Sequence, residues 1–198
     1  MESGRDLGMD AALRMARIIH CDLTLVNASS WQWWNAVANE DYKSGLIYTD
    51  YKNPGDVETI YESKLLWVLG NYSRFIRPSM VRVELSGPQD IASLLASAYH
   101  EPQSGRLVMV FVNLAATPQN VQVASISGPQ TEGIPRRFAP YTTDAQKNLA
   151  AGEEVDINNS FVIPPRSVVT LVGDIAMPGK PSVADTLPQT MVITNSSH

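Results

Sequence analysis

The feature that most constrains this chain is a series of short apolar strands that begins just after Pro78 and continues to Val172. Several of them alternate apolar and polar residues, which is typical of a strand with one buried face. Gly, Pro and Asn separate the strands at intervals of about 8–12 residues, as in a β-sandwich. The strands are expected at 81–85, 91–99, 107–114, 121–126, 136–143, 154–157 and 167–172. We therefore predict an antiparallel β-sandwich over residues 79–176 and a flexible, Pro/Ser/Thr-rich tail over residues 177–198.

The first 78 residues follow a different pattern, helix–strand–helix. Apolar residues recur at helical spacing over residues 9–23, and a strand-like run follows at 23–29. Residues 35–60 are polar and are expected to form a long loop. A second helix is predicted over residues 60–76, ended by Pro78. Because the sandwich dominates the chain, the fold class predicted is α+β, with residues 1–78 as a separate segment.

A run of aromatic residues, Trp31-Gln-Trp33-Trp34-Asn35, comes directly after the predicted strand. Strict alternation would put Trp31 and Trp33 on one face and Trp34 on the other. An aromatic ring offers a flat surface of large area at low entropic cost, on which the C–H face of a sugar can stack. We interpret Trp33 as a packing residue and leave both roles, packing and ligand contact, open for Trp34.

Three pieces of the chain resemble glycoside hydrolase family 30. They are Trp31-Gln-Trp-Trp34-Asn35, Leu69-Gly-Asn-Tyr-Ser-Arg-Phe-Ile-Arg-Pro78 and Ile163-Pro-Pro-Arg-Ser-Val-Val-Thr-Leu-Val172. The resemblance covers residues 8–173. It implies the end of the eighth strand of a (β/α)8 barrel, the last barrel helix and the closing strand of a side β-sandwich. Residues 1–78 would then be the last part of a barrel, which makes the chain a C-terminal segment.

The same resemblance implies a retaining glycosidase whose two catalytic glutamates lie on barrel strands four and seven, upstream of Met1. It favours Trp34, next to Asn35, as the sugar-facing residue, with Trp31 nearby. A retaining enzyme holds two carboxyl groups about 5–5.5 Å apart on rigid strands. The acidic residues between positions 22 and 62 fall instead on helix ends and the long loop, and are expected to be solvated surface charges: Asp22, Glu40, Asp41, Asp50, Asp56, Glu58 and Glu62.

Composition excludes several other classes of function. The net charge of −5 without a basic run disfavours nucleic acid and anionic membranes as partners. The single Cys21 permits no internal disulfide and no multi-cysteine zinc site, and no metal or cofactor is expected. His20, at a helix end, is expected to act as a cap. No signal peptide is expected in this chain, whereas the full-length parent is expected to be secreted or periplasmic.

These observations favour the C-terminal portion of a secreted, family-30-like retaining glycoside hydrolase that acts on a β-linked polysaccharide or glycan. Alone it is expected to lack both catalytic glutamates. The alternatives are a carbohydrate-binding module and a small glycan-active protein assembled as an oligomer. A homo-oligomer is expected, because the strand at residues 23–31 and the apolar stripes of both helices would lack their barrel neighbours.

Overall fold

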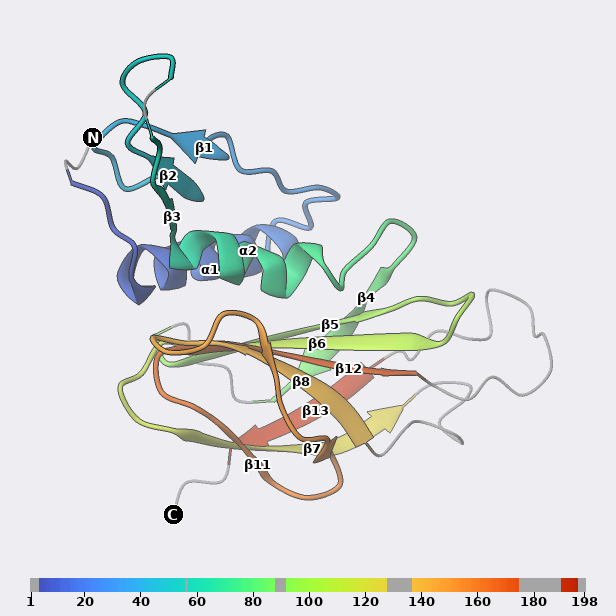
Figure 1. Cartoon of the computed structure of the whole chain (residues 1–198). Helices are drawn as coiled ribbons and strands as arrows, with labels where there is room; N and C mark the ends of the chain where they lie inside the picture. Colours follow the sequence, from blue (N-terminus) through green and yellow to red (C-terminus); the bar gives the residue numbers. More distant parts are fainter. Residues whose placement is uncertain (1–3, 56, 88–91, 128–136, 175–189, 196–198) are drawn as a thin grey trace.

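Figure 1 shows the computed structural model as three tiers: a small sheet, a pair of helices and a two-layered β-sandwich. The structure describes residues 4–55, 57–87, 92–127, 137–174 and 190–195. Most of the described strands are antiparallel, and the described residues also form two helices. The predicted α+β class with a β-sandwich is therefore confirmed.

The sandwich is built from one continuous path of strands that folds into two layers. Among the described residues the order is β10-β8-β12-β6-β5-β4-β13-β7-β11, with β9 paired to β8. The helices lie over the layer that contains β5, β6, β12 and β8, while β7, β11 and β13 form the far layer (Figure 1). The bounds are β4 Val81–Ser86, β5 Leu94–His100, β6 Arg106–Asn113, β7 Gln119–Ser127, β8 Arg137–Thr143, β9 Ala150–Ala151, β10 Val155–Asp156, β11 Phe161–Ile163, β12 Ser167–Asp174 and β13 Thr190–Asn195.

The layer next to the helices is apolar on both faces. In β6, Leu107, Met109 and Phe111 belong to the core between the two layers. The alternate residues of the same strand, including Val108 and Val110, belong to the core under the helices. A strand buried on both faces is a continuous apolar run instead of an alternating one, as residues 107–112 are. This shared layer joins the helices to the sandwich.

The helices are α1, Met9–Thr24, and α2, Lys64–Ser73. The apolar stripe of α1, which includes Leu13 and Ile19, packs in the same core as α2 and the sheet. Asn71 of α2 is fully buried, and its amide donates to the Tyr141 carbonyl and to Thr170 Oγ1, both at 3.0 Å. The expectation that the helices keep uncovered apolar stripes is therefore wrong, because the sandwich covers them.

The predicted strand at residues 23–29 does not form. Leu23 and Thr24 complete α1, and residues 25–36, all of them described, contain no strand. Asn27 takes a φ of 55°, a left-handed conformation that Asn tolerates, and the Ala28 N–H bonds to the Asp22 carbonyl at 2.9 Å. These contacts end the helix and turn the chain. A lone strand also needs neighbours to pair its backbone, and none is present in the described part of this region.

The prediction of a long loop over residues 35–60 is also wrong, because this region is not only loop. It contains most of a small three-stranded sheet: β1, Val37–Ala38, pairs in parallel with β2, Ile47–Thr49, which pairs antiparallel with β3, Ile60–Glu62. Because β3 occupies residues 60–62, the second helix begins four residues later than predicted. The order helix, strand, helix nevertheless holds, with the strands at other residues.

Part of the predicted tail is a strand in the sandwich. β13, Thr190–Asn195, lies between β4 and β7, parallel to β4 and antiparallel to β7. Within the described residues it is the only connection between the β7–β11 pair and β4. The rest of the predicted tail lies outside the described residues, and the domain division at residues 78/79 stays a prediction.

Candidate functional site

Trp31 and Trp33 point to the same side of the chain, as alternation predicts. Their rings stack with centroids 5.8 Å apart and an interplanar angle of 18°. The indole N–H of Trp31 donates to Asp22 Oδ2 at 2.9 Å, and that of Trp33 to the Ser44 carbonyl at 2.6 Å. Both rings also pack against the core under the helices. Trp33 therefore has the packing environment predicted for it, and Trp31 shares it.

Trp34, between Trp33 and Asn35, is 71% exposed. Its neighbour Asn35 is half-buried, and the Asn35 amide donates to Ser44 Oγ at 3.5 Å. Leu25 and Val26, earlier in the same segment, are each 71% exposed as well. An exposed indole beside an amide offers a flat apolar surface with hydrogen-bonding groups at its edge, which is the combination a sugar ring can use.

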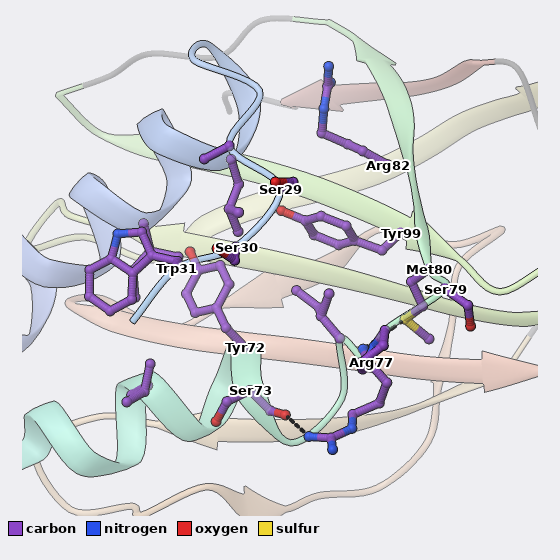
Figure 2. Close-up of a pocket in the computed structure, with 16 residues that line it drawn as sticks. Ser29, Ser30, Trp31, Tyr72, Ser73, Arg77, Ser79, Met80, Arg82 and Tyr99 are labelled. Atoms are coloured by element: carbon purple, nitrogen blue, oxygen red, sulfur yellow. Dashed lines mark hydrogen bonds between the residues drawn. The ribbon is translucent and has the colours of Figure 1, made fainter. Parts of the chain in front are cut away.

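A cavity of about 560 Å³ lies behind Trp31, between the helix pair and the sandwich. This volume falls in the range of small-molecule sites, about 300–1,000 Å³. Figure 2 shows Tyr72, from α2, and Tyr99, from β5, pointing toward the segment that carries Ser29 and Ser30. The cavity is lined by Ile19, Leu23, Ala28, Ser29, Ser30, Trp31, Leu69, Tyr72, Ser73, Ile76, Arg77, Pro78, Ser79, Met80, Arg82 and Tyr99.

Both arginines of the cavity are held by the protein. Arg77 Nη1 donates to the Ser73 carbonyl and Arg82 Nη2 donates to Asn27 Oδ1, both at 2.8 Å. Burial, and to a lesser extent the charge of Arg82, lowers the pKa of His20 to about 4. His20 is thus neutral at neutral pH. The expected role as a cationic helix cap is wrong, because such a cap requires a protonated imidazole.

The acidic residues near the tryptophans are engaged in local structure. Asp22 accepts from Trp31, Asp41 accepts the Arg5 N–H at 3.0 Å, and Asp50 accepts the Thr59 N–H at 2.6 Å. Asp56 lies outside the described residues. Among the residues that the structure describes, no group of three or more His, Cys, Asp or Glu could hold a metal ion. In the described part of the chain, neither helix is long and apolar enough to cross a membrane.

Comparison with known proteins shows what the chain is similar to. Residues 1–48, which contain α1 and the tryptophan run, match the model of O-glycosyl hydrolase family 30. The chain is also similar to a conserved exported protein from Bacteroides fragilis, with 30% identity and a TM-score of 0.69 over 83% of this chain and 34% of that one. Over residues 1–48 the chain therefore resembles glycoside hydrolase family 30.

Two solved family-30 enzymes share the fold of the segment. One is an endoxylanase from Clostridium papyrosolvens, with 22% identity and a TM-score of 0.61 over 87% of this chain and 40% of that one. The other is a subfamily 8 xylanase from Clostridium acetobutylicum, with 22% identity and a TM-score of 0.62 over 87% of this chain and 41% of that one. The chain thus spans between about a third and two-fifths of the length of these three proteins.

The structure adds a cavity that sequence reasoning missed. Trp31, a candidate site residue, does line it, whereas Tyr72 falls in the predicted helix 60–76 and Tyr99 at the end of the predicted strand 91–99. The two tyrosines are 27 positions apart and meet only because α2 packs on the sheet. No local spacing could have indicated this meeting, since it depends on tertiary packing.

Proposed function

We propose that this chain is the C-terminal, glycan-contacting part of a secreted retaining glycoside hydrolase that acts on a β-linked polysaccharide or glycan. One observation carries the proposal: Trp34, within the stretch that matches the family model, is 71% exposed while its neighbours Trp31 and Trp33 are packed. Trp34 is exposed together with Leu25, Val26 and Val37 of the same part of the chain, and a group of exposed apolar residues often marks a binding site. Asn35 beside it supplies polar atoms for sugar hydroxyls.

The segment alone is proposed to bind glycan without hydrolysing it. A retaining glycosidase needs an acid/base carboxyl group and a nucleophilic carboxylate about 5–5.5 Å apart. Here Asp22, Asp41 and Asp50 each accept a hydrogen bond from the protein's own structure. We place the two catalytic glutamates on barrel strands four and seven of the parent protein. In that setting Trp34 and Asn35 would contact the sugar chain next to the reacting residue.

Isothermal titration calorimetry on the purified chain tests this proposal, with xylan fragments as the first probe and cello- and laminari-oligosaccharides as further probes. Trp34→Ala is expected to abolish any heat of binding, because the sugar loses its stacking surface. The matched control is Tyr51→Ala, which removes another exposed aromatic ring, 41% exposed and outside the tryptophan run. Equal affinity of the wild type and Trp34→Ala would remove Trp34 from the site. Release of reducing sugar by the chain alone would contradict the non-catalytic reading.

A second proposal concerns self-association. Leu25, Val26, Trp34 and Val37 are all at least 60% exposed within thirteen residues of the chain. Such a group of exposed apolar residues on a soluble protein often marks an interface. We propose that the chain forms a homo-oligomer that uses this segment and leaves the sandwich free. Sedimentation of the wild type and of Leu25→Ser/Val26→Ser tests this. A monomer at micromolar concentration with the wild-type sequence would refute it.

A further inference from the structure

The outward face of α1 carries a second apolar line, apart from the face that packs in the core. Ala11, Ile18 and Leu25 are spaced seven residues apart, which places them in one line along a helix. Ile18 is 50% exposed and Leu25 is 71% exposed. Leu25 follows the last residue of α1 but keeps a helical conformation, with φ −93° and ψ −42°. An apolar line outside the core face is typical of a helix that packs against another chain.

Two residues of opposite charge lie on this line, on either side of Ile18. Arg14 is four residues before Ile18 and is exposed, and Asp22 is four residues after it and half-buried. Each is therefore about 6 Å from Ile18 along the helix axis, in opposite directions. Asp22 Oδ2 accepts the Trp31 indole N–H at 2.9 Å, which holds the carboxylate beside the helix.

This arrangement is self-complementary for an antiparallel pair of α1 helices. A two-fold axis beside Ile18 places each residue opposite the residue at the same distance on the other side of Ile18. Ile18 then faces Ile18 of the second copy, and Arg14 of each copy faces Asp22 of the other. Ala11, whose side chain is small, leaves room for Leu25 of the second copy. In a parallel pair the like charges would face each other, which opposes association.

A cavity of about 240 Å³ beside the line fits the same arrangement. Its α1 lining is Ala11, Arg14, Met15 and Ile18. This i, i+3, i+4, i+7 set is the four-residue hole that receives a side chain of a facing helix in knobs-into-holes packing. An arginine has five N–H donors, so Arg14 can keep its contacts within the chain and still bind a carboxylate that enters this hole.

The two carboxylates that line the cavity are both engaged within the chain. Asp6 accepts the Gly8 and Ala11 N–H groups, and Asp10 is paired with Arg166. The negative charge of an incoming Asp22 is therefore met by Arg14, while the neighbouring carboxylates are already balanced.

We propose that two copies of this chain pair their α1 helices antiparallel across Ile18. The pairing deepens the self-association proposed above and rests on it, since Leu25 belongs to both surfaces. It adds the register: Ile18 on the two-fold axis, with an Arg14–Asp22 contact at each end. A contact of about this size, one helix from each copy, is expected to be weak, with a dissociation constant in the micromolar range.

Sedimentation equilibrium of the full chain tests the pairing. Ile18→Glu places two carboxylates face to face and should weaken the dimer by at least about tenfold. Because Ile18 is half exposed, the change should leave the circular dichroism spectrum unaltered. The matched control is Val57→Glu, the same kind of change at a residue that is 98% exposed outside α1, which should leave the dissociation constant unchanged.

A charge exchange tests the register. Arg14→Asp and Asp22→Arg each place like charges opposite each other at both ends of the pair, so each variant alone should associate more weakly than the wild type. Mixed in equal amounts, the two variants should form a heterodimer in which opposite charges face each other at both ends. A mixture that associates no more tightly than either variant alone would overturn the register.

Crosslinking locates the axis. Ile18→Cys in a Cys21→Ser background, which removes the chain's one native cysteine, should give a disulfide-linked dimer under mild oxidation. Arg17→Cys in the same background lies about 100° further round the helix and should not. A dimer lost in Leu25→Ser/Val26→Ser but unaffected by Ile18→Glu would keep the self-association of the following segment and refute the α1 pairing. A wild-type monomer at micromolar concentration would refute both.

Discussion

Strand β6 and the segment 25–36 both contain large apolar residues, but those of β6 are buried and the first two of the segment are exposed. Both contain neighbouring large apolar residues: Leu107 to Val112 in the strand, and Leu25 and Val26 at the start of the segment. In β6 every residue after Arg106 is buried, whereas Leu25 and Val26 are each 71% exposed. The difference lies in the neighbours. β6 pairs with β5 on one side and β12 on the other.

The comparison shows that an apolar run becomes a strand only where other strands supply backbone partners. Each unpaired buried N–H or carbonyl costs about 1–3 kcal/mol, which is enough to outweigh the local preference of Leu and Val for extended structure. Residues 25–36 do not form a strand, and several of their backbone groups bond instead to Cys21, Asp22 and Leu46. This placement is also what leaves Trp34 accessible to a ligand.

The largest effect is expected from a charge placed in the doubly buried strand. Val110→Asp puts a carboxylate into the core under the helices, where Val110 is fully buried, and should cost more than about 4 kcal/mol or prevent folding. Val26→Asp, the matched change in the exposed segment, should alter the free energy of unfolding by less than about 0.5 kcal/mol. Urea unfolding followed by circular dichroism measures both. Similar losses in the two variants would show that the segment is packed.

The next largest effect on the free energy of unfolding is expected from pH, through His20. His20 is 5% exposed, and its pKa of about 4 in the folded state lies below the ordinary 6.5 of the unfolded chain. Between these values the unfolded chain binds the proton more readily than the folded chain. The stability contributed by neutral His20 is therefore fully present above pH 6.5 and is lost as the pH drops toward 4. At about 1.36 kcal/mol per pKa unit, the loss is about 3 kcal/mol at most.

Unfolding of the wild type and of His20→Gln at pH 7 and pH 4.5 isolates this contribution. The burial-lowered pKa of His100 acts in both proteins and cancels in the difference. The wild type should lose more stability on acidification than His20→Gln. Equal losses would mean that His20 is solvated, like the residues that follow it.

A smaller loss is expected from the buried amide that ties α2 to the sheet. Asn71→Ala removes two donated hydrogen bonds and leaves the Tyr141 carbonyl and Thr170 Oγ1 short of a partner, which should cost about 2 kcal/mol. The control, Asn148→Ala, removes an exposed acceptor of Lys64 Nζ and should cost well under 1 kcal/mol. Thermal unfolding ranks the two. A larger loss from Asn148→Ala would contradict the assigned burial.

The smallest effect is expected at the proposed ligand surface. Trp34→Ala should change the free energy of unfolding by less than about 0.5 kcal/mol, because the ring is mostly in water. Trp33→Ala should cost about 1–2 kcal/mol, since it removes a half-buried ring that stacks on Trp31 and bonds to Ser44. Chemical denaturation of the two variants compares them directly. A destabilising Trp34→Ala would assign that ring to packing.

The sequence predicted the sandwich and α1 well because both follow local rules. Alternation and Gly/Pro punctuation are read within a few residues, and α1 has a regular apolar period. β13 could not be predicted, since Thr190–Asn195 are weakly patterned and find their place only between β4 and β7. The strand at 23–29 was predicted from propensity without knowledge of its neighbours. Of the candidate site, the family resemblance indicated Trp34, Asn35 and Trp31, whereas Tyr99 entered only through tertiary packing.

Hydrogen exchange followed by NMR, with and without a bound xylan fragment, tests the central claim most directly. Without ligand, the amides of residues 25–36 should exchange rapidly and those of residues 107–112 slowly. With ligand, protection should rise at Trp34 and Asn35 and leave the sandwich unchanged. Slow exchange across residues 25–31 in the free chain, or ligand protection confined to the sandwich, would contradict the account of an exposed glycan-contacting segment.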